Sequence, residues 1–133
     1  MKARFLLDAN IVIDHIGGFR LLPERVFKSE TILLSQVAMA EIKVGFDDTR
    51  RGHKDKEVFE KVLRLPNVVQ ITLTSATTDL YASVFRSLRA AGTPIPINDI
   101  WLAAQALEHG AILVSRDRHF EAVANLQTMI LEN

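Results

Sequence analysis

Short apolar runs alternate along this chain with longer segments in which apolar residues recur every three to four positions. Runs of the first kind are typical of strands, and periodic segments of the second kind are typical of helices. Strands that alternate with helices form a parallel sheet, because each helix returns the chain across a face of that sheet. The sequence therefore predicts an α/β fold with helices on both faces of a central parallel sheet. The expected strands span residues 4–8, 31–35, 68–72, 111–115 and 127–131, and the expected helices span residues 36–47, 54–65, 75–91 and 99–109, with a further short helix after Asp117.

Residues that favour helix ends support these boundaries. Ser35 and Asn98 precede two of the expected helices and are the residue types that cap a helix start. Gly92 and Gly110 follow two helices, at positions that favour a left-handed backbone. The stretch TPIPIN (93–98) is expected to be extended, because a residue before proline avoids the helical region.

Length and composition predict one globular domain that spans residues 1–133. Lys plus Arg and Asp plus Glu number 16 each, so the net charge is zero and a nucleic-acid binder must cluster its cations locally. The absence of cysteine excludes disulfides and thiolate metal sites. No apolar stretch is long enough to span a bilayer, and no signal peptide is recognisable. We therefore expect a cytoplasmic protein with no membrane contact.

Acidic residues occupy the places where a doubly wound sheet binds ligands, at the carboxyl ends of its strands. Asp8 closes the first expected strand, Asp117 follows the fourth, and Asp99 opens the last long helix. Each of these three also fits an ordinary role at a turn or a helix start. Glu41 is harder to explain as structure, because it lies on the apolar side of the 36–47 helix. The set of four, rather than any single acid, indicates a site.

Carboxylates gathered in one pocket repel one another and raise one another's pKa values. A hard divalent cation removes that conflict, and oxygen-only ligands favour Mg²⁺ or Mn²⁺ over Zn²⁺. Such an ion activates water and stabilises the charge that develops on a phosphate. Metal-assisted phosphodiester hydrolysis is therefore the chemistry that the four acids indicate.

The same acids carry a resemblance to a known family. Four segments resemble, in order, the signature blocks of PIN domains and especially of VapC-type toxins. These segments are LLDANIVID (6–14), SQVAMAEIKVGF (35–46), PIPINDIWLAAQALEHG (94–110) and ILVSRDRHF (112–120). The resemblance implies a three-layer α/β/α sandwich and a Mg²⁺- or Mn²⁺-dependent endoribonuclease. It places the family's catalytic and metal-binding quartet on Asp8, Glu41, Asp99 and Asp117.

Polar residues near the quartet extend the resemblance. Asn10 matches a polar position that implies orientation of Asp8 or of a metal-bound water, although a helix N-cap is the role we favour. Ser115 stands where many relatives have threonine, and its hydroxyl is expected to bond a carboxylate or a phosphate. His119 departs from the asparagine or aspartate of many relatives, which leaves a second metal site open. We interpret Asp14 as a solvated helix residue.

Basic residues are the expected contacts for RNA. Arg116 and Arg118 flank Asp117 and would position phosphates without reading their sequence. A second basic stretch covers residues 50–64, but acidic residues interrupt it. We favour a solvated helix face for that stretch.

The resemblance also implies partners. They are an RNA substrate, a cognate antitoxin protein and a second copy of the chain in a homodimer, with DNA reached only through the antitoxin. An RNA-maturation nuclease without an antitoxin would carry the same acids, so the sequence does not separate the two. A catalytically inactive PIN binding module is a further alternative, against which the complete quartet argues.

Two other classes of α/β protein fit less well. A phosphoacceptor receiver domain needs an acidic pair after the first strand, whereas Asp8 is followed by Ala9 and Asn10. It also needs a lysine after the last strand, and QTMILEN has none. A dinucleotide- or nucleotide-binding domain is excluded because neither a GxGxxG nor a Walker A sequence is present.

Overall fold

A wholly parallel sheet forms the centre of the structure, a computed structural model that describes residues 2–132. The ends of the expected 1–133 domain, Met1 and Asn133, lie outside the described residues. The five strands run in the order β3-β2-β1-β4-β5, with parallel pairing throughout. They are β1 (Arg4–Leu7), β2 (Thr31–Ser35), β3 (Val68–Ile71), β4 (Ile112–Ser115) and β5 (Thr128–Ile130).

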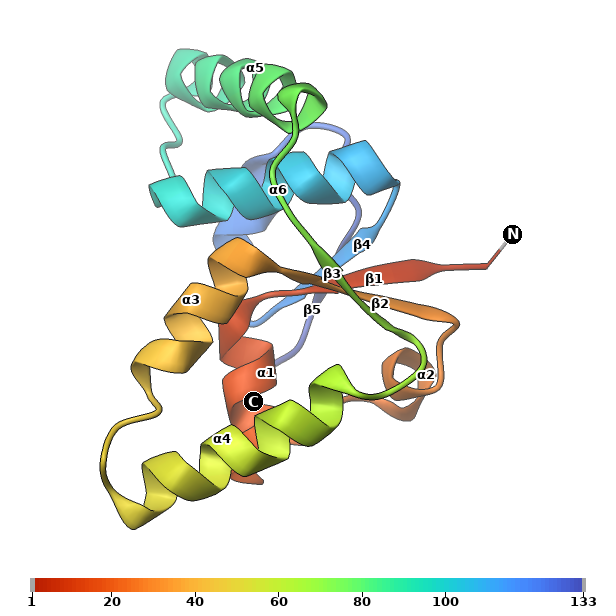
Figure 1. Ribbon diagram of the computed structural model, residues 1–133. Coiled ribbons are helices and arrows are strands. Elements are labelled where there is room, and N and C mark those ends of the chain that lie inside the picture. Colours follow the sequence, from red (N-terminus) through yellow and green to blue (C-terminus); the bar gives the residue numbers. More distant parts are fainter. Residues whose placement is uncertain (1, 133) are drawn as a thin grey trace.

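Helices cover both faces of this sheet and make a three-layer α/β/α sandwich, as the sequence predicts. Helices α1 and α4 lie on one side, and α5 and α6 lie on the other (Figure 1). The helices are α1 (Ala9–Gly17), α2 (Glu24–Phe27), α3 (Gln36–Val44), α4 (Arg50–Leu63), α5 (Ser75–Ala91) and α6 (Ile97–His109), and the 3₁₀ helix η1 covers Arg118–Ala122. Within residues 2–132, no helix is both long and apolar enough to cross a membrane.

The strand order reverses beside β1. The chain moves outward from β1 through β2 to β3, and then crosses to the other side of β1 to form β4. A reversal of this kind opens a crevice at the carboxyl ends of the two central strands. In this protein that crevice lies where β1 and β4 end.

The central strands are buried on both faces. Phe5, Leu6 and Leu7 follow one another in β1 and are at most 2% exposed, and Leu113 and Val114 of β4 are fully buried. Strands covered by helices on both sides require such continuous apolar runs. Each fully buried side chain of this size stabilises the fold by about 1.5–3 kcal/mol, so the strand ends that carry the acids rest on a rigid base.

Helix α6 begins earlier than the sequence predicts. The expected N-cap was Asn98, but the helix starts at Ile97 and Pro96 holds the N-cap position without a side-chain bond. Proline suits a helix entry, because it has a fixed φ and no N–H that needs a partner. The side chain of Asn98 is therefore released from capping, and its Nδ2 donates to Glu41 Oε1 at 3.4 Å.

Other boundaries shift for local reasons. Helix α4 begins at Arg50 rather than at residue 54, because the Thr49 hydroxyl caps it by accepting from the Gly52 N–H at 2.9 Å. Helix α3 ends at Val44, before the expected residue 47, although Ser35 caps its start as predicted. Helix α2 was not expected, and the short helix after Asp117 is the 3₁₀ turn η1.

Candidate active site

Asp8 is fixed at the centre of the sheet edge. It follows β1 directly, is 4% exposed, and donates its N–H to the Val114 carbonyl of β4 at 2.9 Å. Its Oδ1 accepts from the Ala9 N–H at 2.8 Å, which caps α1, and its Oδ2 accepts from the Ser115 hydroxyl at 2.7 Å. Burial raises the pKa of this carboxyl, and the hydrogen bonds from Ser115 and Ala9 offset part of that rise.

Asp117 and Asn10 meet across the same edge. Asp117 follows β4, and its N–H donates to the Ser115 hydroxyl at 2.9 Å. Asn10 donates from Nδ2 to Asp117 Oδ2 at 3.2 Å, so it is not the helix cap that we favoured, because Asp8 holds that position. Asp117 stands at the N-cap of η1 but makes no capping bond with its side chain. Its carboxylate therefore contacts Asn10 and does not cap the start of η1.

Asp99 comes from the opposite layer of the sandwich. It lies in the first turn of α6, and its Oδ2 is 2.8 Å from His119 Nε2. Its pKa is raised to about 6, chiefly by burial and then by the negative charge of Asp8, while His119 acts in the opposite direction. Burial and nearby negative charge therefore outweigh the effect of His119 on this carboxyl.

Glu41 completes the set from α3. It is partly buried, and the Asn98 amide is its hydrogen-bond partner at 3.4 Å. Burial raises the pKa of its carboxyl, and the charge of Asp8 raises it further. The charge of Asp8 also raises the pKa of Asp99, and the charge of Asp117 raises the pKa of Asp8. The structure therefore places the predicted acids Asp8, Glu41, Asp99 and Asp117, each from a different part of the chain, within electrostatic range of one another.

The two arginines next to Asp117 are held by carboxylates. Arg116 Nε lies 3.3 Å from Asp14 Oδ2, and the Asp14 side chain is only 14% exposed. The expectation that Asp14 is a solvated residue is therefore wrong. Arg118 pairs with Glu121 at 3.1 Å and with Glu132. Any phosphate that binds these arginines must compete with their carboxylate partners, and their role with RNA stays a prediction.

Two contacts of the acids were not predicted from the sequence. Asn98 was expected only as a helix cap, yet it contacts Glu41. His119 was noted for its departure from relatives, but its contact with Asp99 joins η1 to α6. Both contacts connect elements distant in sequence, which local patterns do not report.

The donors at this site are oxygen atoms, which are the ligand type that Mg²⁺ and Mn²⁺ prefer. Within residues 2–132, no three Asp, Glu or His side chains are close enough together to hold an ion in common. Mg²⁺ commonly keeps several waters and takes one or two carboxylates together with substrate phosphates. Asp8, Glu41, Asp99 and Asp117 offer carboxylates for this, and Asn10 Oδ1 beside them is buried without a hydrogen-bond partner. These are the residues that would hold the ion.

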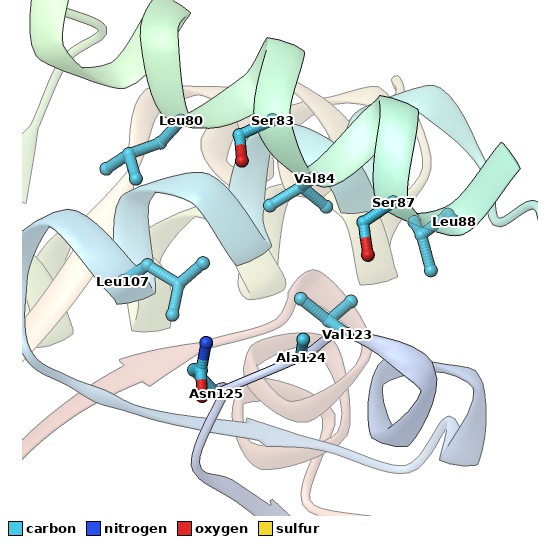
Figure 2. Close-up of a pocket in the computed structure, with 9 residues that line it drawn as sticks. All are labelled: Leu80, Ser83, Val84, Ser87, Leu88, Leu107, Val123, Ala124 and Asn125. Carbon is cyan, nitrogen blue, oxygen red and sulfur yellow. The ribbon is translucent and has the colours of Figure 1, made fainter. Parts of the chain in front are cut away.

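A pocket elsewhere takes no part in this site. Residues of α5, Leu107 of α6 and residues 123–125 line a hollow of about 330 Å³, toward which Ser83 and Ser87 point their hydroxyls (Figure 2). Its lining contains no acidic residue. Asp8 and Asp117 of the carboxylate site instead follow the ends of β1 and β4.

The fold and the site together define a class of protein. It is a parallel α/β/α sandwich whose topological switch point carries a cluster of carboxylates in place of a glycine-rich phosphate loop. The chain belongs to the PIN-domain family, whose model matches residues 5–126.

Two ribonucleases are similar to the chain over nearly its whole length. It is 30% identical over 128 residues to ribonuclease VapC4 of Mycobacterium tuberculosis, covering 96% of this chain and 97% of the relative. It is 25% identical over 134 residues to ribonuclease VapC2 of Rickettsia felis, covering 97% and 96%.

Solved structures show the same fold. The VapBC2 structure from Rickettsia felis, bound to a DNA fragment from its promoter, matches with a TM-score of 0.81 at 21% identity over 97% of this chain and 99% of that one. The DNA-bound VapBC structure from Salmonella typhimurium matches with a TM-score of 0.79 at 19% identity over 96% and 98%.

Proposed function

We propose that this protein is an endoribonuclease that hydrolyses RNA phosphodiester bonds and serves as the toxin of a toxin–antitoxin pair. The observation that carries the proposal is the meeting of four carboxylates at the switch point of the sheet, where burial and mutual repulsion raise the pKa values of Asp8, Glu41 and Asp99. Ribonuclease names among the relatives support the substrate class.

We propose Mg²⁺ or Mn²⁺ as the cofactor, which when bound would supply water activation and would neutralise charge on the scissile phosphate. Each acid has a partner that fixes its orientation. Ser115 and Ala9 hold Asp8, and Asn10 holds Asp117. These hydrogen bonds keep the carboxylates in place before substrate arrives, so little reorganisation is needed on binding.

His119 and Asn98 contact the other two acids. His119 contacts Asp99 at 2.8 Å, and the Asn98 amide donates to Glu41 at 3.4 Å. Asn98 is exposed and His119 is partly buried, and we propose that RNA reaches the acids from the carboxyl edge of the sheet. Arg116 and Arg118 lie at this edge and would contact neighbouring phosphates.

The partners that we propose are an antitoxin protein and a second copy of this chain. Solved relatives are VapBC toxin–antitoxin structures, which supports an antitoxin. An arginine from that protein would pair bidentately with the carboxylates and so block the site. A maturation nuclease without an antitoxin remains the second candidate, since its acids would be identical.

Removal of divalent metal is expected to stop RNA cleavage. Carboxylates bind Mg²⁺ weakly and largely through substrate, so excess EDTA should abolish cleavage of a single-stranded RNA. Added Mn²⁺ or Mg²⁺ should restore it, as followed by gel analysis of a labelled RNA. Full cleavage in EDTA would contradict the metal mechanism while leaving the ribonuclease activity in place.

Unopposed expression of the protein is expected to arrest bacterial growth. Co-expression of the protein encoded beside it should relieve the arrest, because that partner would cover the acids. The Asp99→Asn variant serves as the inert control, and growth curves are the measurement. Harmless expression of a protein that cleaves RNA in the test tube would favour the maturation nuclease.

A further inference from the structure

A second pocket lies beside the acids along the carboxyl edge of the sheet. Residues 35–37 at the start of α3, residues 71–73 at the end of β3 and Gln105 of α6 line a space of about 250 Å³. Strand β2, which ends at Ser35, pairs directly with β1, which leads into Asp8. Neighbouring strands are about 4.8 Å apart, so this pocket begins one strand away from the acids. Along α6, Gln105 lies about 9 Å beyond Asp99.

Gln105 has an unusual environment for an amide. It is fully buried, and within residues 2–132 neither its Oε1 nor its Nε2 has a hydrogen-bond partner. Buried amides are almost always paired, because an unpaired one loses its bonds to water without compensation. The amide presents an acceptor beside a donor. Its complement is a ligand edge that also places a donor next to an acceptor.

The walls of the pocket suit a flat ring. Ile71 is 8% exposed and Val37 is partly buried, so apolar side chains flank the amide. The rim consists of Gln36, Thr72 and Leu73, all exposed, and a ligand would reach the buried Gln105 by displacing these side chains. The space is large enough for one nucleobase.

We propose that this pocket binds a nucleobase of the RNA close to the scissile phosphate and that Gln105 pairs with the hydrogen-bonding edge of that base. The proposal rests on the ribonuclease function proposed above and adds the source of its base selectivity. Contacts to phosphate carry no sequence information, whereas side-chain amides read base edges bidentately. The amide of Gln105 is placed to do so.

Cleavage of matched RNA oligonucleotides tests this proposal. The set would differ only in the base on each side of the cleaved bond, and kcat/KM would be measured for the wild type and for Gln105→Leu. The wild type is expected to prefer one base by about 5- to 150-fold, the discrimination of a bidentate pair. Gln105→Leu should lower kcat/KM for the preferred RNA until all RNAs fall within about threefold of one another. The same change at exposed Gln127, outside the pocket, should leave the preference intact.

A binding measurement keeps the test independent of catalysis. The side-chain amide of Gln105 would be followed by NMR in metal-free wild-type protein during titration with each of the four nucleoside monophosphates. A shift of that signal with the preferred nucleotide supports the pocket. An unmoved signal, or a base preference that survives in Gln105→Leu, overturns it.

The two proposals fail in different ways. A wild type that cleaves RNA without base preference removes the nucleobase pocket but not the ribonuclease. A wild type that cleaves no RNA removes the ribonuclease, and the NMR titration then decides alone whether the pocket takes a base.

Discussion

Asp8→Asn is expected to reduce RNA cleavage by about a hundredfold to a thousandfold, on the scale of losing a main electrostatic group of an active site. Asp8 is the most buried of the acids, and its charge acts on both Asp99 and Glu41. Asparagine keeps the shape and an oxygen that can accept from the Ala9 N–H, so α1 stays capped. Folding should therefore be preserved while the metal-binding carboxylate is lost.

Single-turnover cleavage in saturating Mn²⁺ measures the loss of activity, and a circular dichroism melt measures whether folding is preserved. Asp79→Asn provides the matched control, because Asp79 is an exposed residue of α5. That control should cleave RNA at the parental rate. An Asp8→Asn variant that melts like the parent and still cleaves near the parental rate would remove Asp8 from catalysis.

The strands were readable from the sequence because both faces of the central sheet are covered. A strand such as β1 then shows as an unbroken apolar run, and the residue after it stands at the carboxyl edge of the sheet. For this reason the position of Asp8 was predictable from local pattern and fold class alone. The same holds for Ser35, whose role as a cap depends only on the residues that follow it.

Contacts between the layers could not be predicted from such local sequence patterns. Both Pro96 and Asn98 are acceptable helix starts by local propensity, and the structure begins α6 directly after Pro96, which leaves Asn98 free to contact Glu41 of α3. Asp14 is an acidic position on the mostly apolar helix α1 and was expected to face solvent, yet Arg116 reaches it from the end of β4. Pairings of this kind depend on which elements become neighbours, which a single sequence does not state.

The position of Gln105 in the sequence already indicated that its amide would be buried. It stands in the apolar run WLAAQAL of α6, between residues that the structure shows to be buried. A lone amide in such a run either pairs with another buried group or faces a ligand. Its lack of a partner required the structure, because the sequence alone does not show what surrounds it.

Asp99→Asn is expected to stabilise the metal-free protein above about pH 6, in addition to reducing cleavage by orders of magnitude. The folded protein holds the Asp99 proton more tightly than the unfolded chain, since the pKa rises from 3.8 to about 6. This group therefore favours folding most at about pH 4 and below, and that contribution is lost as the pH rises to about 6. At about 1.4 kcal/mol per pH unit, the upper bound of this loss is about 3 kcal/mol, and solvent screening of this half-buried group makes the loss smaller. Asparagine carries no charge and avoids it.

Saturating metal should reduce or reverse the stability advantage of Asp99→Asn over the wild type. An ion at 100 times its dissociation constant stabilises the folded state by about 2.7 kcal/mol, and the variant, with one ligand fewer, gains less. Chemical denaturation of both proteins at pH 4 and pH 8, with and without Mn²⁺, measures the difference in unfolding free energy between variant and wild type under each of the four conditions. If Asp99 serves only the dipole of α6, its replacement should instead cost about 0.3–1 kcal/mol with or without metal and leave cleavage intact. A variant that is less stable at pH 8 without metal and still cleaves RNA would place Asp99 outside the site, and the anionic pocket would lose its most perturbed carboxyl.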